Sequence, residues 1–324
     1  MVRQADPFLV GLRCSIVCVR ESAENAGTLR RVCEEIPLRM NQSIARAANR
    51  IRQRVKYTLK ITPNVLLAPL RLLPDFVVIG AQKAGTSSLY QYLVRHPHVA
   101  RAFRKEVHYF DNGCRGGRFW YQAHFPTRFA KWSNSEMITG EATPKYLFEP
   151  DVPERVHELL PGAKLIAILR HPVSRAYSQF QMLKRKNLCT GTFEEWIDRE
   201  LDLISGLHWP LAWRDLERDI VAAPTNCLLR GIYADQLRSW LDFFPREQLL
   251  ILNSERFFAD PQADLDRVAD FLGLPRYTYD DFPVINGGSY DPLNPSTRLR
   301  LLEFFRPHNQ RLYALLGETY DWER

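Results

Sequence analysis

From residue 74 onward, short apolar runs alternate with segments that have the 3.6-residue period of a helix. The runs at 76–79, 164–169 and 248–252 are short and rich in Val, Ile and Leu, which is typical of strands buried on both faces of a parallel sheet. Strands that alternate with helices indicate βαβ units. We therefore expect an α/β domain with a P-loop-like central parallel sheet and helices on both faces.

The remaining segments of this domain can be assigned more coarsely. A short strand is expected at 106–110, and an extended segment at 137–142 leads into a loop. Residues 282–295 form a loop rich in Gly, Pro and Asn, and a pair of helices is expected to follow it up to Trp322. Helices are expected near 86–93, 117–125, 152–160, 173–186, 192–204, 230–243 and 261–272. We expect one domain over 73–324.

Residues 1–72 differ from the rest in pattern and in charge. They hold 13 Lys/Arg against 5 Asp/Glu, a net +8, so the whole-chain charge of +7 leaves −1 for the other residues. Residues 1–39 show no clear period and are expected to be disordered or to lie upstream of a true start near Met40. Residues 41–60 predict a basic amphipathic helix. Three interpretations remain open: a helix packed on the domain or solvated, a peripheral contact with an anionic membrane, or nucleic-acid binding, which the lack of interleaved aromatic residues disfavours.

The composition of the 324 residues is that of an ordinary soluble protein, with 45% hydrophobic and 25% charged residues. No run reaches the roughly 18 apolar residues of a membrane span. The six cysteines form no C-x-x-C pair, so reduced thiols in a cytoplasmic protein are expected rather than a zinc site or a disulfide framework.

The stretch from Pro74 to Leu89 predicts a phosphate-binding loop. An apolar strand passes into the small residues 80–85, and a helix begins at Thr86. This arrangement points backbone N–H groups at an anion. The ATPase motif G-x-x-x-x-G-K-[ST] has its lysine after the second glycine. Here that position is Thr86 and the lysine is Lys83, so an ATPase-type loop is disfavoured; a tight turn with a solvated lysine is the alternative.

A second anion site is predicted after the strand at 164–169. Arg170 follows that strand directly, where ligands bind in α/β sheets, and Ser178 lies about two turns along the next helix. A guanidinium group and a hydroxyl suit a phosphate monoester. Pairing of Arg170 with a structural carboxylate is the alternative.

Glu106 and His108 are two residues apart in a segment expected to be extended, so both should project from one face. A carboxylate beside an imidazole can act as a general base towards a hydroxyl or amine. The alternative is that Glu106 and His108 only occupy alternate positions of a half-buried strand, with no role in catalysis. Glu141 is a third candidate at the same edge, whereas Lys105 and Asp111 are expected to be solvated.

Five motifs in order give the chain a specific resemblance. It resembles the sulfotransferase family, most closely the heparan sulfate glucosamine N- and 3-O-sulfotransferase branch and its bacterial relatives, from about residue 74 to 322. The motifs are G-x-x-K-x-G-T-S at 80–87, K-E-V-H-Y-F-D at 105–111, E-x-T-P-x-Y at 141–146, L-R-x-P-x-x-R-x-x-S at 169–178 and R-G-x-Y at 230–233.

The resemblance implies a co-substrate, 3′-phosphoadenosine 5′-phosphosulfate (PAPS), and no metal. By position, the 5′-phosphosulfate would lie against the loop residues Gln82, Lys83, Ala84, Gly85, Thr86 and Ser87. Arg170 and Ser178 would bind the 3′-phosphate. Glu106 would be the catalytic base, Lys83 would stabilise the leaving oxygen, and His108 would support the acceptor or the sulfuryl group. The acceptor would be a hydroxyl or amine, carried by a carbohydrate or a glycolipid.

The chain departs from the animal enzymes in three respects. It shows no N-terminal transmembrane anchor, Ala142 replaces a lysine in the E-x-T-P motif although Lys145 lies nearby, and the disulfide-closed donor loop near the C-terminus has no counterpart. Two other functions remain open: a P-loop nucleotide kinase or ATPase, which needs a magnesium-holding Asp where Arg170 stands, and a non-catalytic module that binds glycans or membrane surfaces.

Overall fold

The computed structural model describes residues 49, 52, 56–216, 220–221, 226–283, 285, 288 and 290–323. The chain divides into two units, Met1–Thr62 and Pro63–Arg324. Most of the first unit, including residues 1–48 and much of the expected helix at 41–60, lies outside the described residues; residues 49, 52 and 56–60 are helical. The domain boundary expected at residue 73 stays a prediction.

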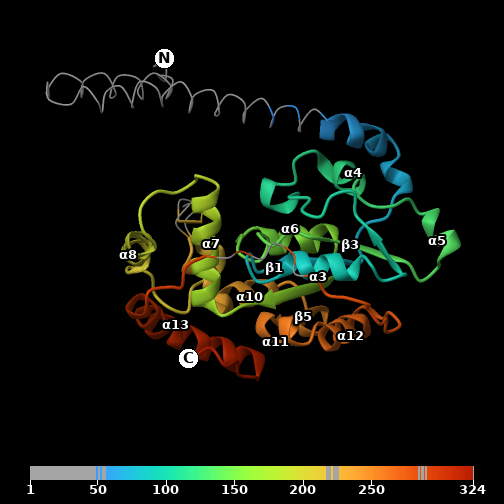
Figure 1. Cartoon of the computed structure of the whole chain (residues 1–324). Coiled ribbons are helices and arrows are strands. Elements are labelled where there is room, and N and C mark those ends of the chain that lie inside the picture. Colours follow the sequence, from blue (N-terminus) through green and yellow to red (C-terminus); the bar gives the residue numbers. More distant parts are fainter. Residues whose placement is uncertain are drawn as a thin grey trace, which may run out of the picture. The chain divides into compact units, whose positions relative to one another are not determined.

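The second unit is built on a five-stranded parallel sheet in the order β2-β3-β1-β4-β5 (Figure 1). The strands are β1 (Phe76–Gly80), β2 (Val99–Arg101), β3 (Ile138–Ala142), β4 (Lys164–Leu169) and β5 (Leu249–Asn253). All four pairings are parallel, and β1 lies between β3 and β4. The chain leaves β1 towards β2 on one side and leaves the neighbouring strand β4 towards β5 on the other side, so the loop after β1 lies at a switch point of the kind where ligands bind in such folds.

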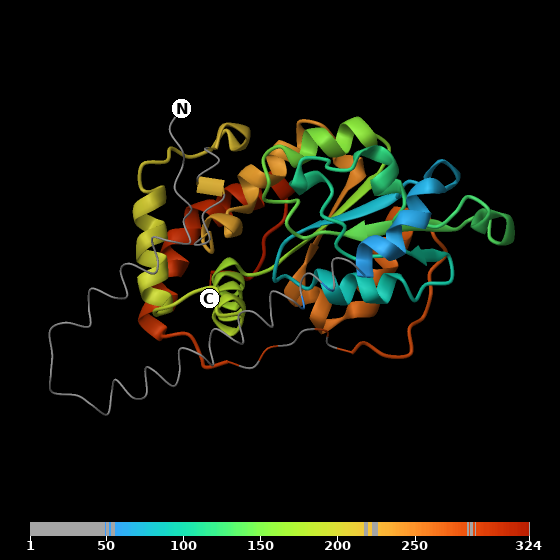
Figure 2. The ribbon, with the colours of Figure 1, turned by 90° about the horizontal axis from the view of Figure 1, so that it is seen from above.

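Helices cover both faces of the sheet, which confirms the predicted fold class. Helix α3 (Thr86–Leu93) and helix α12 (Pro261–Leu272) lie on one face, and α6 (Val152–Leu159) and α10 (Tyr233–Leu241) on the other (Figure 2). For α3, α6 and α10, each of which connects two consecutive strands, this division follows from right-handed crossovers, because connections that run in opposite directions across the sheet place their helices on opposite faces. The other α-helices named below are α4 (Gly117–Gln122), α5 (Ala130–Ser133), α7 (Pro172–Arg185), α8 (Phe193–Ile204), α11 (Ser254–Ala259) and α13 (Pro295–Leu316), and η1 (Ala68–Leu70) is a 3₁₀ turn.

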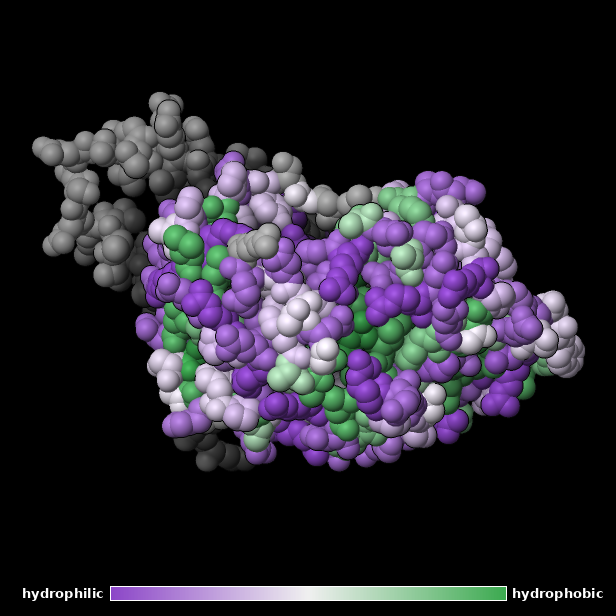
Figure 3. All heavy atoms as spheres, turned by 90° about the horizontal axis from the view of Figure 1, so that it is seen from below, coloured by the Kyte–Doolittle hydropathy of each residue, from purple (hydrophilic) through white to green (hydrophobic). Residues whose placement is uncertain are grey.

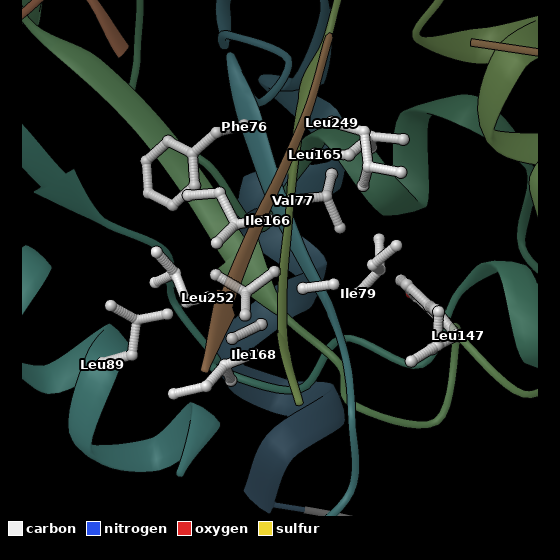
Figure 4. Packing of buried hydrophobic residues seen from close by; sticks show 14 of the residues in the cluster. Phe76, Val77, Ile79, Leu89, Leu147, Leu165, Ile166, Ile168, Leu249 and Leu252 are labelled. Atoms are coloured by element: carbon white, nitrogen blue, oxygen red, sulfur yellow. The ribbon is translucent and has the colours of Figure 1, made fainter. Parts of the chain in front are cut away.

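Alternate residues of the buried strands supply two layers of core (Figure 4). Ile166 and Ile168 point to the side of Leu89 on α3, and Val77 and Leu165 point to the opposite side. All five side chains are fully buried. Burial of a Leu, Ile or Val side chain contributes about 1.5–3 kcal/mol, so the two layers fix the strand register around the loop that follows β1.

Local signals set several helix ends as the sequence predicted. Helix α12 begins after Asp260, whose carboxylate accepts a hydrogen bond from the Ala263 N–H, has Pro261 at its first position and ends at Gly273 in the left-handed conformation. Helix α8 carries a capping box formed by Thr192 and Glu195.

Two expected elements are wrong. Residues 106–110 form no strand: the Val107 N–H bonds to the Glu141 carboxylate, His108 has φ 57°, and Phe110 begins a 3₁₀ turn. The backbone donor that a strand would use for pairing is therefore satisfied by a side chain. The helical pair expected near the C-terminus is one helix, α13, of 22 residues with Pro307 inside it.

In the part of the chain that the structure describes, no helix is both long enough and apolar enough to span a bilayer.

Candidate active site

The loop between β1 and α3 leaves the N-terminus of α3 open. Gly85 precedes the helix with φ 108°, and no side chain caps the first turn. A Cβ at Gly85 would lie 3.0 Å from the ring of Phe258, so both conformation and space require glycine. The first N–H groups of a helix lack intrahelical acceptors and favour an anion. The predicted phosphate loop is therefore present as a structural element.

Cations surround Lys83, the central residue of this loop. Burial lowers the pKa of Lys83, and the charges of Arg185, Arg170 and Lys186 lower it further. The Arg170 guanidinium donates a hydrogen bond to the Lys83 carbonyl, 3.1 Å away. Like charges held together in a half-buried place repel one another, and a bound anion would relieve that repulsion.

Arg170 has no carboxylate within ion-pair distance among the described residues. Its backbone carbonyl accepts a hydrogen bond from the Tyr233 hydroxyl at 2.8 Å. This contact ties the end of β4 to α10, and the guanidinium lies beside the loop that holds Lys83. Arg170 therefore lies beside the loop, and its role in binding an anion stays a prediction.

Sequence reasoning gave no role to Arg175, which the structure places behind the same loop. Its side chain is fully buried on α7. It donates to the Gln82 carbonyl at 3.5 Å, to the Gln179 side chain at 2.8 Å and to the Cys227 carbonyl. Arg175 therefore holds the loop against α7. Ser178, also buried, lies three residues further on and shares the helix face of Arg175.

Glu106, His108 and Asp111 form a chain of charged groups. Glu106 Oε2 lies 3.4 Å from His108 Nε2, and His108 Nδ1 lies 2.9 Å from Asp111 Oδ2. Hydrogen bonds to Asp111 and Glu106 raise the pKa of His108 to about 9. The hydrogen bond from His108, with Lys105 beside it, lowers the pKa of Glu106 to about 2. At neutral pH the imidazolium therefore lies between two carboxylates.

The expectation that Lys105 and Asp111 are solvated is wrong. Lys105 Nζ donates to Ser87 Oγ at 2.8 Å and to Glu106 Oε1 at 3.1 Å. The Asp111 side chain is only 3% exposed and also has Lys145 Nζ 3.7 Å away. Lys105 therefore links the anion loop directly to the carboxylate of Glu106, a link that needed the tertiary structure to be seen.

Glu141 is structural rather than a free group at the edge of the sheet. It is fully buried and accepts four hydrogen bonds, from the Tyr121 and Tyr146 hydroxyls, the Thr143 hydroxyl and the Val107 N–H. Burial raises the pKa of Glu141. Its contact with Val107 fixes the backbone between Glu106 and His108, which brings these two side chains together without a strand.

The segment that follows residue 280 passes from α3 to α7. The Tyr92 hydroxyl donates to the Pro283 carbonyl at 2.9 Å, and the Tyr177 hydroxyl donates to the Asp291 carbonyl at 2.9 Å. Tyr92 lies on α3 and Tyr177 on α7. The Gly-rich loop predicted at 282–295 is thus anchored to both helices that carry the candidate anion sites.

Within the described ranges, no group of three His, Cys, Asp or Glu side chains is arranged to hold a metal ion. Cys114, Cys189 and Cys227 are free thiols, and the other three cysteines lie outside the described residues.

Comparison with known proteins gives consistent results. Residues 73–281 match the family model described as "Sulfotransferase domain". The chain is 30% identical to "Membrane-associated sulfotransferase kil1" of Dictyostelium discoideum, over 84% of this chain and 72% of that protein. It is 32% identical to human "Heparan sulfate glucosamine 3-O-sulfotransferase 6", over 78% of this chain and 74% of that protein.

A solved structure shows the same fold. The crystal structure of a sulfotransferase from Alicyclobacillus acidocaldarius is 30% identical to the chain, with a TM-score of 0.57. The match covers 78% of this chain and all of that one. It therefore extends well beyond the loop after β1.

Proposed function

The chain belongs to the sulfotransferase family, and we propose that it transfers a sulfuryl group from PAPS to a hydroxyl or amine of a carbohydrate or glycolipid acceptor. One observation carries this proposal: Lys105 bonds both Ser87, in the first turn of α3 beside the anion loop, and Glu106, the candidate base. A donor held by the loop and an acceptor held by the base would therefore be neighbours.

The basic residues around the loop support a donor with two anionic ends. The α3 N-terminus and Lys83 suit the 5′-phosphosulfate, and Arg170 with Ser178 suits the 3′-phosphate. The charges that act most strongly on Lys83, those of Arg185, Arg170, Lys186 and Arg175, are positive. A sulfuryl group carries less charge than a phosphoryl group, so a lysine and a helix N-terminus can stabilise its transfer without a metal ion.

In the proposed reaction Glu106 takes the proton of the acceptor hydroxyl or amine, whose oxygen or nitrogen attacks sulfur. The bond from sulfur to the bridging oxygen breaks, and Lys83 stabilises the charge on the departing 3′-phosphoadenosine 5′-phosphate. His108, held by Asp111, orients the Glu106 carboxylate. Positioning and charge stabilisation supply most of the catalysis in such transfers.

The low pKa of Glu106 bears on this role, because a carboxylate with a pKa of about 2 is a weak base at neutral pH. Two cations, Lys105 and His108, cause the shift. Lys105 also contacts the anion loop. We infer that Lys105 turns towards the donor when it binds, which removes one hydrogen bond from Glu106 and raises its pKa as the acceptor arrives.

Carbohydrate is the acceptor class that the relatives support. The human relatives are named for action on heparan sulfate glucosamine. In this chain Ala142 is fully buried at the end of β3, where the animal enzymes carry a lysine, and the nearby cation is Lys145, which pairs with Glu149 at 2.9 Å and lies near Asp111. We therefore propose a carbohydrate or glycolipid acceptor without assigning the glycan.

A transfer assay with labelled donor tests the proposal and identifies the acceptor in the same experiment. Purified protein is incubated with ³⁵S-labelled PAPS and a cell extract, and labelled products are analysed by mass spectrometry. Wild type should label a defined product, while Lys83→Ala and Glu106→Gln should not. Transfer by both variants at the wild-type rate would show that the residue assignment is wrong.

The cytoplasmic location and the peripheral membrane contact through residues 41–60 are part of the same proposal. A relative is named for membrane association. Supporting features in this chain are the +8 charge of residues 1–72 and the basic amphipathic pattern of 41–60. Fractionation of cells that express the tagged chain tests both: the protein should sediment with membranes and be released by high salt.

A further inference from the structure

Two segments that are distant from the candidate active site in the fold lie side by side at one end of the second unit. One is the turn around η1, residues 66–71, and the other is 127–133, which includes α5. The Arg128 N–H donates to the Leu70 carbonyl at 2.8 Å, and Arg71 forms an isolated bridge with Thr127. Helix α5 projects from this end in both ribbon views (Figures 1 and 2).

These segments expose large apolar side chains, which we name the α5 tip. Trp132 is 84% exposed and Leu66 is 80% exposed, and Leu67, Leu70 and Phe129 are each close to half exposed. The rings of Phe129 and Trp132 lie 4.9 Å apart between centroids. Five large apolar groups on two hydrogen-bonded segments leave much apolar surface in water.

Exposure of single apolar residues is ordinary, and the α5 tip differs in its local density. On the face of the molecule in Figure 3, hydrophobic residues lie between hydrophilic ones and are densest across the middle of the face. Leu299 on α13, 63% exposed, is an exposed leucine outside the α5 tip. Clustered apolar side chains that include Trp and Phe mark sites of contact with a partner or a membrane.

Basic residues accompany the apolar ones. Arg128 is exposed, and Lys131 is partly exposed with Asp75 at 3.9 Å. The chain that leads to Leu66 is the basic segment, with net charge +8 over residues 1–72. Apolar groups that can enter the headgroup region, with adjacent positive charge, complement an anionic bilayer surface.

We propose that the α5 tip is a membrane-docking surface that inserts Trp132 and Phe129 into the headgroup region of an anionic bilayer. A stable protein–protein interface needs about 800 Å² and 20–30 residues on each partner. A four-residue helix that projects with two aromatic rings is a small wedge, and a bilayer accepts such a wedge without a complementary shape. Tryptophan favours the membrane–water boundary because one end is apolar and the other can hydrogen-bond.

This inference rests on the peripheral-membrane part of the proposed function and not on sulfuryl transfer. It adds a structured apolar contact to the electrostatic attraction expected of residues 41–60. The two contributions can be separated, because the α5 tip acts through apolar burial and residues 41–60 through charge.

Vesicle binding by the full-length chain tests the proposal. Co-sedimentation is measured with phosphatidylcholine vesicles and with vesicles that also contain phosphatidylserine. Wild type should bind the mixed vesicles, and Phe129→Ser with Trp132→Ser should reduce the partition constant roughly ten-fold or more. The matched control is Leu299→Ser, which should bind as wild type does.

The other outcomes are equally definite. A second variant changes four basic residues of 41–60 together to Gln: Arg46, Arg50, Arg52 and Arg54. It should bind vesicles more weakly at low salt only. If vesicle binding is lost in this variant and not in the Phe129/Trp132 variant, the docking role of the α5 tip is wrong. If the Phe129/Trp132 variant binds vesicles normally but sediments as a smaller species than wild type, the surface pairs copies of the chain and the proposal fails. Unchanged melting temperatures and unchanged turnover on a soluble acceptor would show that the variants fold.

Discussion

At the level of single residues, the structure concentrates positive charge on one lysine. Lys83 has φ 73° and four basic neighbours that lower its pKa in addition to burial. His108, a second non-glycine candidate site residue with a left-handed backbone, has φ 57°. A non-glycine residue in this conformation costs about 1–2 kcal/mol. The surrounding contacts hold both residues in place, as is common at functional sites.

Lys83→Ala should lower turnover without unfolding the protein. A charge-stabilising donor contributes ~3–4 kcal/mol to the transition state, so kcat should fall by roughly two to three orders of magnitude. Single-turnover transfer from labelled PAPS measures the effect. Lys131→Ala, at the α5 tip, is the matched control and should keep wild-type turnover on a soluble acceptor.

Asp111→Asn should change the pH dependence of the reaction. Hydrogen bonds to Asp111 and Glu106 raise the pKa of His108 from 6.5 to about 9, so losing the Asp111 charge should move it back towards 6.5. The alkaline limb of kcat/KM should therefore shift to lower pH. The stability that these bonds contribute is present below pH 6.5 and lost as pH rises through 9, and the variant should lose part of it.

A pH series of kcat/KM and of the urea midpoint measures both effects. Asp270→Asn, which removes the partner of exposed Arg276, is the matched control. An alkaline limb in the same place as in wild type would exclude His108 as the titrating group.

Among the elements, the segment 105–109 shows how a buried carboxylate can replace strand pairing. Glu141 accepts hydrogen bonds from the Val107 N–H on this segment and from the Tyr121 hydroxyl on α4. The Ala142 N–H in turn donates to the Lys105 carbonyl at 3.0 Å. The backbone on both sides of Glu106 is therefore held against the end of β3. This backbone sets the positions of the Glu106 and His108 side chains.

Glu141→Gln should destabilise the fold and also impair the site. The amide NH₂ replaces an oxygen that accepts two donors, and a buried donor left without an acceptor costs about 1–3 kcal/mol. Urea unfolding should show a loss of this size, and kcat should fall more than the affinity for the donor nucleotide. Glu136→Gln, an exposed carboxylate beside His98, is the control. Equal stability of the two variants would contradict the role given to Glu141.

For the whole molecule, the candidate anion sites link elements that are far apart in sequence. The β1–α3 loop contacts Arg170 at the end of β4 and Arg175 on α7, while the segment after residue 280 is tied to α3 and α7. An anion bound among these elements would join three parts of the fold. Donor nucleotide should therefore stabilise the second unit as a whole.

Thermal unfolding with 3′-phosphoadenosine 5′-phosphate tests this expectation. A ligand at 100 times its Kd adds about 2.7 kcal/mol of stability, so the melting temperature should rise by several degrees. Arg170→Ala should reduce the rise at the same nucleotide concentration. EDTA should leave both the rise and the turnover unchanged. A shift that requires Mg²⁺ and a nucleoside triphosphate would favour the kinase or ATPase interpretation.

Much of the framework follows from the sequence alone. Buried parallel strands need uninterrupted apolar residues, so the sequence predicts β1, β4 and β5 as short apolar runs, and helical periodicity predicts α8 and α12, at whose starts the structure shows capping residues. The anion loop was equally visible, because only glycine suits the conformation before α3. These features depend on local chemistry and on a period that can be read along the chain.

The contacts that assemble the site depend on residues far apart in sequence. The pairing of Glu106 with His108 was predicted from a strand that does not exist, and Glu141, 34 residues beyond Val107, holds the segment instead. The link from Lys105 to Ser87 and the support from Arg175 were also unpredicted. Strand order and side-chain hydrogen bonds across the fold decide such contacts, because local sequence pattern carries no information about which distant donor meets which acceptor.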